Sequence, residues 1–181
     1  PQEEELALMN MGPESYYHAW AFTDVAEIFY DRTIAFTKAS DKESWSKRYL
    51  ELLRKISLNH NSKRMLLKNP PNTARIPVLL ELFPNAKFIH IHRDPFEVYA
   101  STEKLLTRVL PYFQFRECPE GFMESHIITT YSRLMKAYLD HRSKIPEGQL
   151  VEISMAALGN YPMEELERIY ASLGLKLGKE S

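Results

Sequence analysis

Apolar residues recur along the chain with two different periods, and these periods predict its secondary structure. Where the period is three to four residues, an amphipathic helix is expected. Where a short apolar run is bounded by Pro, Gly, Asn or Asp, a buried strand is expected. The predicted helices cover residues 3–11, 40–56, 74–83, 96–110, 122–142 and 162–174, and the predicted strands cover RMLLK (64–68), KFIHIH (87–92) and QLVEI (149–153).

Short buried strands that alternate with helices indicate a parallel sheet with helices on both faces. We therefore predict an α/β fold with three layers, formed by residues 1–181 as one domain. In such sheets ligands bind beyond the carboxyl ends of the strands. Two charged side chains, Lys68 and Arg93, lie at predicted strand ends and are therefore expected at the same edge of the sheet.

Arg93 is followed at once by a helix start, because Asp94-Pro95 is a favourable pair for the N-cap and first helical position. A helix N-terminus and a guanidinium together suit a phosphate or sulfate group. Ser101, two turns into the helix, can add a hydroxyl. The competing interpretation is that Arg93 pairs with a carboxylate and Ser101 only packs.

Other polar residues on the strands are open to two interpretations. Lys68 either points into the ligand crevice or is a solvated charge. His90 and His92 share one face of their strand, where histidines are more often hydrogen-bonded core residues than catalysts. We interpret His90 as a structural residue. His92 is nearer the crevice, and for it both a structural and a catalytic role remain possible interpretations.

Composition narrows the function further. The net charge is −1, which gives no general attraction to nucleic acid, and the single cysteine, Cys118, fits a reducing compartment such as the cytoplasm. The apolar runs are shorter than the roughly 20 residues that span a bilayer. The histidines show no ligand spacing with carboxylates or Cys118, so no metal site is predicted. Walker A, G-x-G-x-x-G and G-x-S-x-G motifs are absent.

Residues 66–101 resemble the middle of the sulfotransferases that use 3′-phosphoadenosine 5′-phosphosulfate, especially their bacterial-type branch. They read LLKNPPNTARIPVLLELFPNAKFIHIHRDPFEVYAS. That branch is similar in its K-[SN]-P-x-[HN]-T-x-R-I and F-I-x-I-x-R-[DN]-P-x-x-V-x-x-S patterns. The opening PQEEELAL and the closing LVEISMAALGNYPMEELERIYASLGL also resemble segments of this branch, in the same order.

The resemblance implies the fold of P-loop nucleoside triphosphate hydrolases and a donor, 3′-phosphoadenosine 5′-phosphosulfate, that leaves as adenosine 3′,5′-bisphosphate. It implies that Arg93 and Ser101 bind the 3′-phosphate and that Lys68 lies near the transferred sulfuryl group. The acceptor is expected to be a small molecule, a carbohydrate or a lipid with a hydroxyl or amine. Many relatives have a histidine as general base where this chain has Asn72. Since an amide cannot serve as a base, the candidates are His92 and the acidic cluster Glu3, Glu4 and Glu5. The likeness of PQEEELAL to the family segment favours a carboxylate of that cluster.

Two other functions stay open: a nucleotide kinase on the same fold, and a relic of the family that binds nucleotide without catalysis. The resemblance also implies a glycine-rich phosphosulfate loop ahead of the acidic segment. We expect an upstream strand, loop and helix, or a second chain, to complete the sheet, and residues 1–181 alone to transfer no sulfate.

Overall fold

The protein is a mixed α/β structure with many helices and a small parallel sheet; the computed structural model describes residues 3–59 and 63–176. The first half contains α1 (Glu4–Met11), α2 (His18–Ala21), α3 (Ala26–Tyr30), α4 (Ala39–Asn59), α5 (Ile76–Leu82) and short turns η1 (Thr23–Val25), η2 (Asp31–Ala35) and η3 (Pro70–Thr73). The second half contains β1 (Phe88–His92), α6 (Pro95–Phe113), α7 (Phe122–His141), η4 (Arg142–Lys144), β2 (Leu150–Ser154), α8 (Met155–Asn160) and α9 (Pro162–Ser172).

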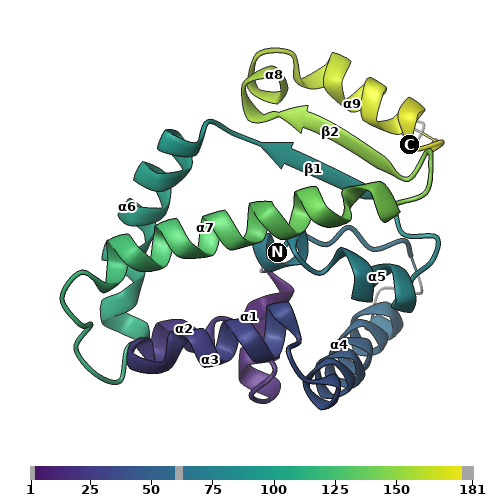
Figure 1. Cartoon of the computed structure of the whole chain (residues 1–181). Helices are drawn as coiled ribbons and strands as arrows, with labels where there is room; N and C mark the ends of the chain where they lie inside the picture. Colours follow the sequence, from purple (N-terminus) through teal and green to yellow (C-terminus); the bar gives the residue numbers. More distant parts are fainter. Residues whose placement is uncertain (1–2, 60–62, 177–181) are drawn as a thin grey trace.

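The long helix α7 crosses the molecule between two groups of elements (Figure 1). Helices α1 to α5 lie on one side, where Trp45 and Tyr49 of α4 pack against Leu8 of α1 and Val78 of α5. The sheet lies on the other side. The apolar stripe predicted for residues 40–56 is thus confirmed as core packing.

Strands β1 and β2 run parallel, with Phe88 opposite Leu150 and His92 opposite Ser154. Helix α9 covers one face of β2, where Val151 and Ile153 pack against Ile169 and Leu173. Helix α7 covers the other face of the sheet, through Tyr138. The strands predicted over 87–92 and 149–153 are therefore confirmed, as is the α/β class.

The strand predicted over 64–68 is wrong in this structure. Residues 64–68 have no regular secondary structure, and their apolar side chains are exposed rather than buried. Leu66, for example, is 88% exposed. A strand needs a neighbour for its N–H and C=O groups, and the sheet formed by the described residues has only the order β1-β2. The three-layer sheet expected from the sequence is accordingly present only in part.

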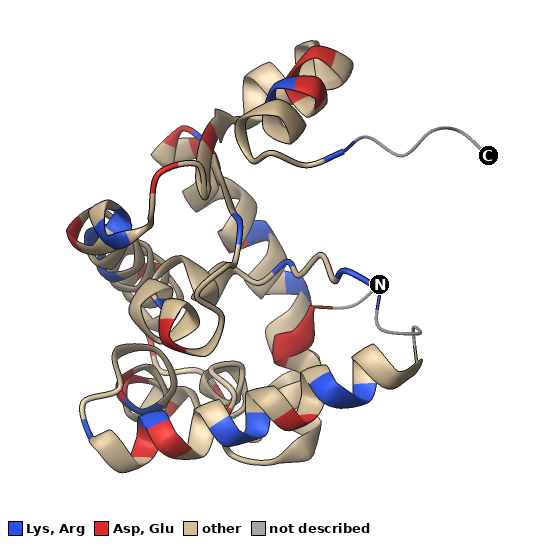
Figure 2. Cartoon of the chain, turned by 90° about the vertical axis from the view of Figure 1, so that its right-hand side faces the viewer, with Lys and Arg blue, Asp and Glu red and all other residues tan. Residues whose placement is uncertain are grey.

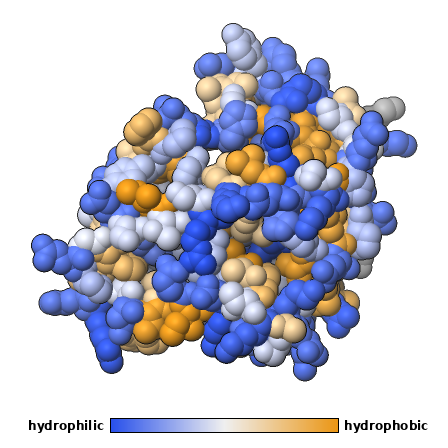
Figure 3. Space-filling model, viewed as in Figure 1, coloured by the Kyte–Doolittle hydropathy of each residue, from blue (hydrophilic) through white to orange (hydrophobic). Residues whose placement is uncertain are grey.

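The surface carries both signs of charge. In the cartoon of Figure 2 the positions of acidic and basic residues are interspersed over the visible helices. Ion pairs such as Lys42 with Glu81 and Arg48 with Glu51 join residues of opposite charge. Apolar residues reach the face shown in Figure 3 in several separate places among hydrophilic ones. No helix in the described part of the chain is long and apolar enough to cross a bilayer.

Candidate functional site

The acidic segment at the start of α1 meets the loop of residues 68–75, which leads into α5. The two stretches are more than 60 residues apart in sequence, yet three successive glutamates contact the loop. The contacts join Glu3 to Lys68, Glu4 to Asn72, and Glu5 to both Asn69 and Arg75. The structure thus brings the predicted residues Glu3, Glu4, Glu5 and Lys68 into one cluster.

Glu5 and Arg75 form the buried centre of this cluster. Both side chains are 0% exposed, and the guanidinium donates from Nη1 to Oε2 at 2.8 Å and from Nη2 to Oε1 at 3.2 Å. The amide N–H of Tyr16 and the Nδ2 of Asn69 also donate to the carboxylate, at 2.6 and 2.7 Å. Burial opposes ionisation, but the Arg75 charge and these hydrogen bonds outweigh it and hold the pKa of Glu5 below its ordinary value.

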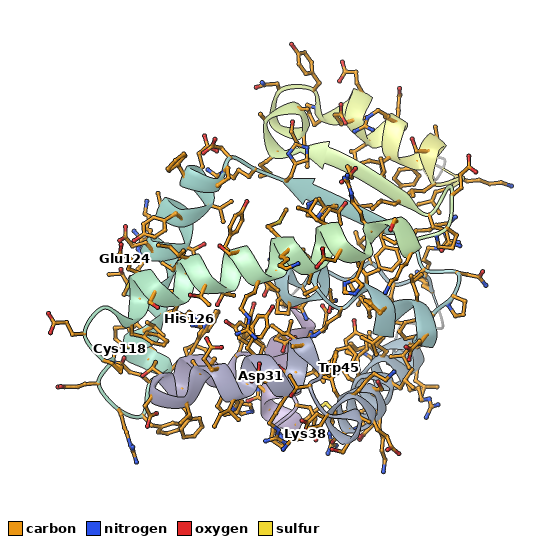
Figure 4. The ribbon with its side chains drawn as sticks, in the orientation of Figure 1. Asp31, Lys38, Trp45, Cys118, Glu124 and His126 are labelled. Carbon is orange, nitrogen blue, oxygen red and sulfur yellow. The ribbon has the colours of Figure 1, made fainter. Side chains whose placement is uncertain are left out.

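Arg75 is anchored on its other side as well. Its Nε donates to the carbonyl of Thr33 at 2.8 Å, and its guanidinium lies 4.6 Å from the ring centroid of Trp45, which Figure 4 labels on α4. A cation over an indole face is favourable. Arg75 therefore ties α1, η2 and α4 to the loop, and a fully buried charge with such partners suits a structural role.

Glu4 is nearly as buried but carries no ion pair in the described structure. Its Oε1 accepts from the Tyr49 hydroxyl at 3.2 Å and from Asn72 Nδ2 at 3.0 Å. Burial and the neighbouring Glu4 charge raise the pKa of Tyr49, so its phenol stays protonated and donates. Asn72, which stands where many relatives have a histidine, thus holds a carboxylate.

Glu3 differs from both because its side chain is 23% exposed and contacts the Nζ of Lys68, whose own side chain is 77% exposed. The Tyr17 hydroxyl donates to the second carboxylate oxygen of Glu3. These three groups lie at one rim of a groove of about 910 Å³. The rest of the groove is mostly apolar, lined by α1, residues 63–67 and α6, with Trp20, Leu66, Leu105, Val109 and Phe113 among its residues.

Arg93 and Ser101 lie elsewhere, at the start of α6 beyond the carboxyl end of β1. As predicted, Asp94 caps this helix, since its Oδ1 accepts from the Phe96 and Glu97 amides at 2.9 and 3.3 Å. Arg93 pairs through Nε with Glu97 at 2.7 Å, and Ser101 is exposed. Neither lines the groove beside Lys68.

The groups around Arg93 are of the kind that binds a phosphate. Within the described residues the guanidinium uses only Nε, toward Glu97, and its side chain is 42% exposed, so both Nη groups can reach an anion. The N-terminus of a 19-residue helix follows directly. The pairing of Arg93 with a carboxylate, the competing interpretation, is also present. The roles of Arg93 and Ser101 in donor binding therefore stay predictions.

The strand histidines separate in the way their positions suggested. His90 stacks on Tyr138 of α7, with ring centroids 3.8 Å apart, and burial lowers its pKa. His92 is exposed at the strand end. Both lie outside the Lys68 cluster, and no three His, Cys, Asp or Glu residues gather as a metal site in the part of the chain that is described.

Sequence reasoning did not assign roles to Arg75, Asn69 or Tyr17. For Arg75 a signal was present, because the pattern K-[SN]-P-x-[HN]-T-x-R-I includes this arginine. Tyr17 carried no such signal, since its contact with Glu3 depends on how the chain folds back after α1.

The model of the sulfotransferase family matches residues 4–179, almost the whole chain. The chain belongs to the sulfotransferase family. Two curated relatives, the omega-hydroxy-beta-dihydromenaquinone-9 sulfotransferases Stf3 of Mycobacterium bovis and Mycobacterium tuberculosis, are each 29% identical over 177 residues. The match covers 97% of this chain and 45% of each relative, so the chain spans about half of their length. No solved structure matches it.

Proposed function

We propose that this sulfotransferase chain contributes to moving a sulfuryl group from 3′-phosphoadenosine 5′-phosphosulfate to a hydroxyl or amine. The observation that carries the proposal is the position of Lys68. It ends the segment that the family resemblance places beside the transferred group, and it lies at the rim of a groove next to carboxylates that can accept a proton.

Each residue has a distinct part in the proposed reaction. Arg93 and Ser101 hold the 3′-phosphate, and Lys68 neutralises charge that develops on the leaving 5′-phosphate. The donor, when bound, supplies the sulfuryl group. The acceptor loses its proton to a base, for which the sequence offers Glu3, Glu4, Glu5 and His92 as candidates. Of these, Glu3 and Glu4 line the groove, while the burial and ion pair of Glu5 favour a structural role.

The relatives are named for an omega-hydroxy-beta-dihydromenaquinone-9. The proposal takes from this only the class, a small molecule with a hydroxyl group. Carbohydrate and other lipid acceptors stay within the proposal.

Substitution of Arg93 tests the donor site. In the complete natural protein, Arg93→Ala should weaken binding of adenosine 3′,5′-bisphosphate by about 2–4 kcal/mol, because a charge-assisted partner of a desolvated phosphate is lost. Ser101→Ala should cost about 1 kcal/mol. Isothermal titration calorimetry measures both.

Arg54→Ala is the matched control, since Arg54 is exposed on α4 and should leave the affinity unchanged. A folded Arg93→Ala protein with wild-type affinity would contradict the site. ATP serves as the comparison ligand: tighter binding of ATP than of the bisphosphate would favour the nucleotide kinase, and bisphosphate binding without any transfer would favour the non-catalytic relic.

A further inference from the structure

We propose that Glu3 is the carboxylate that accepts the proton of the acceptor. This inference rests on the proposed function and identifies its base. Three adjacent glutamates lie at the same end of α1, but their surroundings differ, and a base must reach both solvent-borne substrate and the transferred group. Burial and hydrogen-bond partners distinguish the three.

Glu5 is fully occupied by its structural partners. Both its oxygens accept hydrogen bonds from Arg75, and the Tyr16 amide, Ser15 and Asn69 complete its surroundings. Its side chain is 0% exposed and does not line the groove. An acceptor molecule cannot reach it without breaking a buried ion pair.

Glu4 is better placed but largely covered. Although it lines the groove, the residue is only 5% exposed, and the Tyr49 hydroxyl and Asn72 amide share one of its oxygens. Its position depends on two side chains of the core. Glu4 therefore presents little of its carboxylate to a substrate in the groove.

Glu3 meets both requirements of a base. It lines the groove, its side chain is 23% exposed, and its Oε1 contacts the Lys68 ammonium. In the proposed function Lys68 lies next to the transferred sulfuryl group, so a base in contact with Lys68 also lies close to that group. A plain surface ion pair would be worth only about 0–1 kcal/mol, and it would not require the further hydrogen bond that holds this carboxylate in place.

That further bond comes from Tyr17, whose hydroxyl donates to Glu3 Oε2. The Tyr17 ring stacks on Trp20, with centroids 4.1 Å apart and planes at 15°. Burial and the Glu3 charge raise the pKa of Tyr17, so the phenol stays protonated and remains a donor. One oxygen of Glu3 is thus fixed against a rigid aromatic pair, and the other is directed toward Lys68.

The proton balance of the step is simple. The acceptor oxygen forms a bond to sulfur while the bond from sulfur to the 5′-phosphate oxygen breaks, and the hydroxyl proton passes to Oε1 of Glu3. Lys68 exchanges the carboxylate for the leaving phosphate oxygen as charge grows there. Each carboxylate oxygen has two lone pairs, so Glu3 can keep the Tyr17 hydrogen bond throughout.

Sulfuryl-transfer kinetics of the complete natural protein test the inference. Glu3→Gln should lower kcat by about 10²- to 10⁴-fold, the usual contribution of a general base, while the affinity for adenosine 3′,5′-bisphosphate changes less than twofold. Glu3→Asp, which keeps the carboxylate, should recover part of the rate. Glu43→Gln, an exposed change on α4, is the control and should leave kcat unchanged.

Two outcomes overturn the inference. If Glu3→Gln keeps the wild-type kcat while Glu4→Gln or His92→Ala loses it, the base is another residue and the proposed function still holds. If the wild-type protein binds the nucleotide but transfers nothing to any hydroxyl acceptor, the proposed function fails and the assignment of Glu3 fails with it.

Discussion

At the scale of single residues, Glu5 and Arg75 are the pair on which the cluster depends. Two charges without solvent exposure are costly unless both are paired and hydrogen-bonded. Here the carboxylate has Asn69, Ser15 and the Tyr16 amide in addition to the guanidinium. The same pair holds α1 against the loop, so the neighbouring Glu3 and Glu4 are positioned by it.

Removal of one partner should therefore be strongly destabilising. Glu5→Gln is expected to lower the free energy of unfolding by about 3–5 kcal/mol, because the buried Arg75 charge loses its counter-ion. Urea denaturation measures the change. Glu43→Gln, at an exposed position of α4, should stay within about 0.5 kcal/mol of wild type.

The stability that Glu5 contributes should also depend on pH. Because the folded-state pKa of Glu5 is lowered, its contribution is complete above the pKa of the unfolded chain, about 4.3. It is lost as the pH falls through the folded-state pKa. Wild type should thus lose more stability than Glu5→Gln on acidification below pH 4, and equal losses would contradict the assignment.

At the scale of elements, the turn from β1 into α6 carries the residues predicted to bind the donor, and its helix cap is present as expected. The capping side chain of Asp94 satisfies two amides of the first helical turn. Arg93 precedes this cap, so the geometry of the helix start determines where its guanidinium lies. An intact first turn is then a condition for anion binding.

Loss of the cap should weaken both helix and binding site. Asp94→Ala is expected to cost about 0.5–2 kcal/mol of stability and to weaken adenosine 3′,5′-bisphosphate, because the first turn frays. Asp94→Asn, whose side chain also caps, should retain most of both. Thermal unfolding and calorimetry provide the two readouts, and an Asp94→Ala protein as stable as Asp94→Asn would show that the cap contributes nothing.

At the scale of the whole molecule, the sheet leaves apolar surface without cover among the described residues. Helix α9 packs on β2 but leaves the same face of β1 uncovered, so Ile91 of β1 is 49% exposed. Residues 64–67, beside the groove, are exposed as well. Exposed apolar surface next to an unpaired strand edge favours an added strand. We propose that a further strand and helix, from the same protein or a second chain, cover this surface.

Comparison of residues 1–181 alone with the complete natural protein tests this proposal. The isolated segment should transfer no sulfate. The backbone amides of β1 and of residues 64–67 should exchange with deuterium more slowly in the complete protein, because an added strand would pair with them. Full activity of residues 1–181 alone, with equal exchange in both, would contradict it.

Sequence and tertiary structure determined different parts of this protein. Local patterns were sufficient for α4, α6, α7, α9 and the two paired strands, because helical period, capping by Asp94 and apolar runs act over a few residues. The same local signal failed for 64–68, because an apolar run becomes a strand only when a neighbour pairs with it. The cluster of Glu3, Glu4 and Glu5 with Lys68 and Arg75 was decided by tertiary structure, because the glutamates lie more than 60 residues before Lys68 and Arg75 in the sequence. The three glutamates are identical in the sequence, and only their burial and hydrogen-bond partners in the folded chain distinguish them.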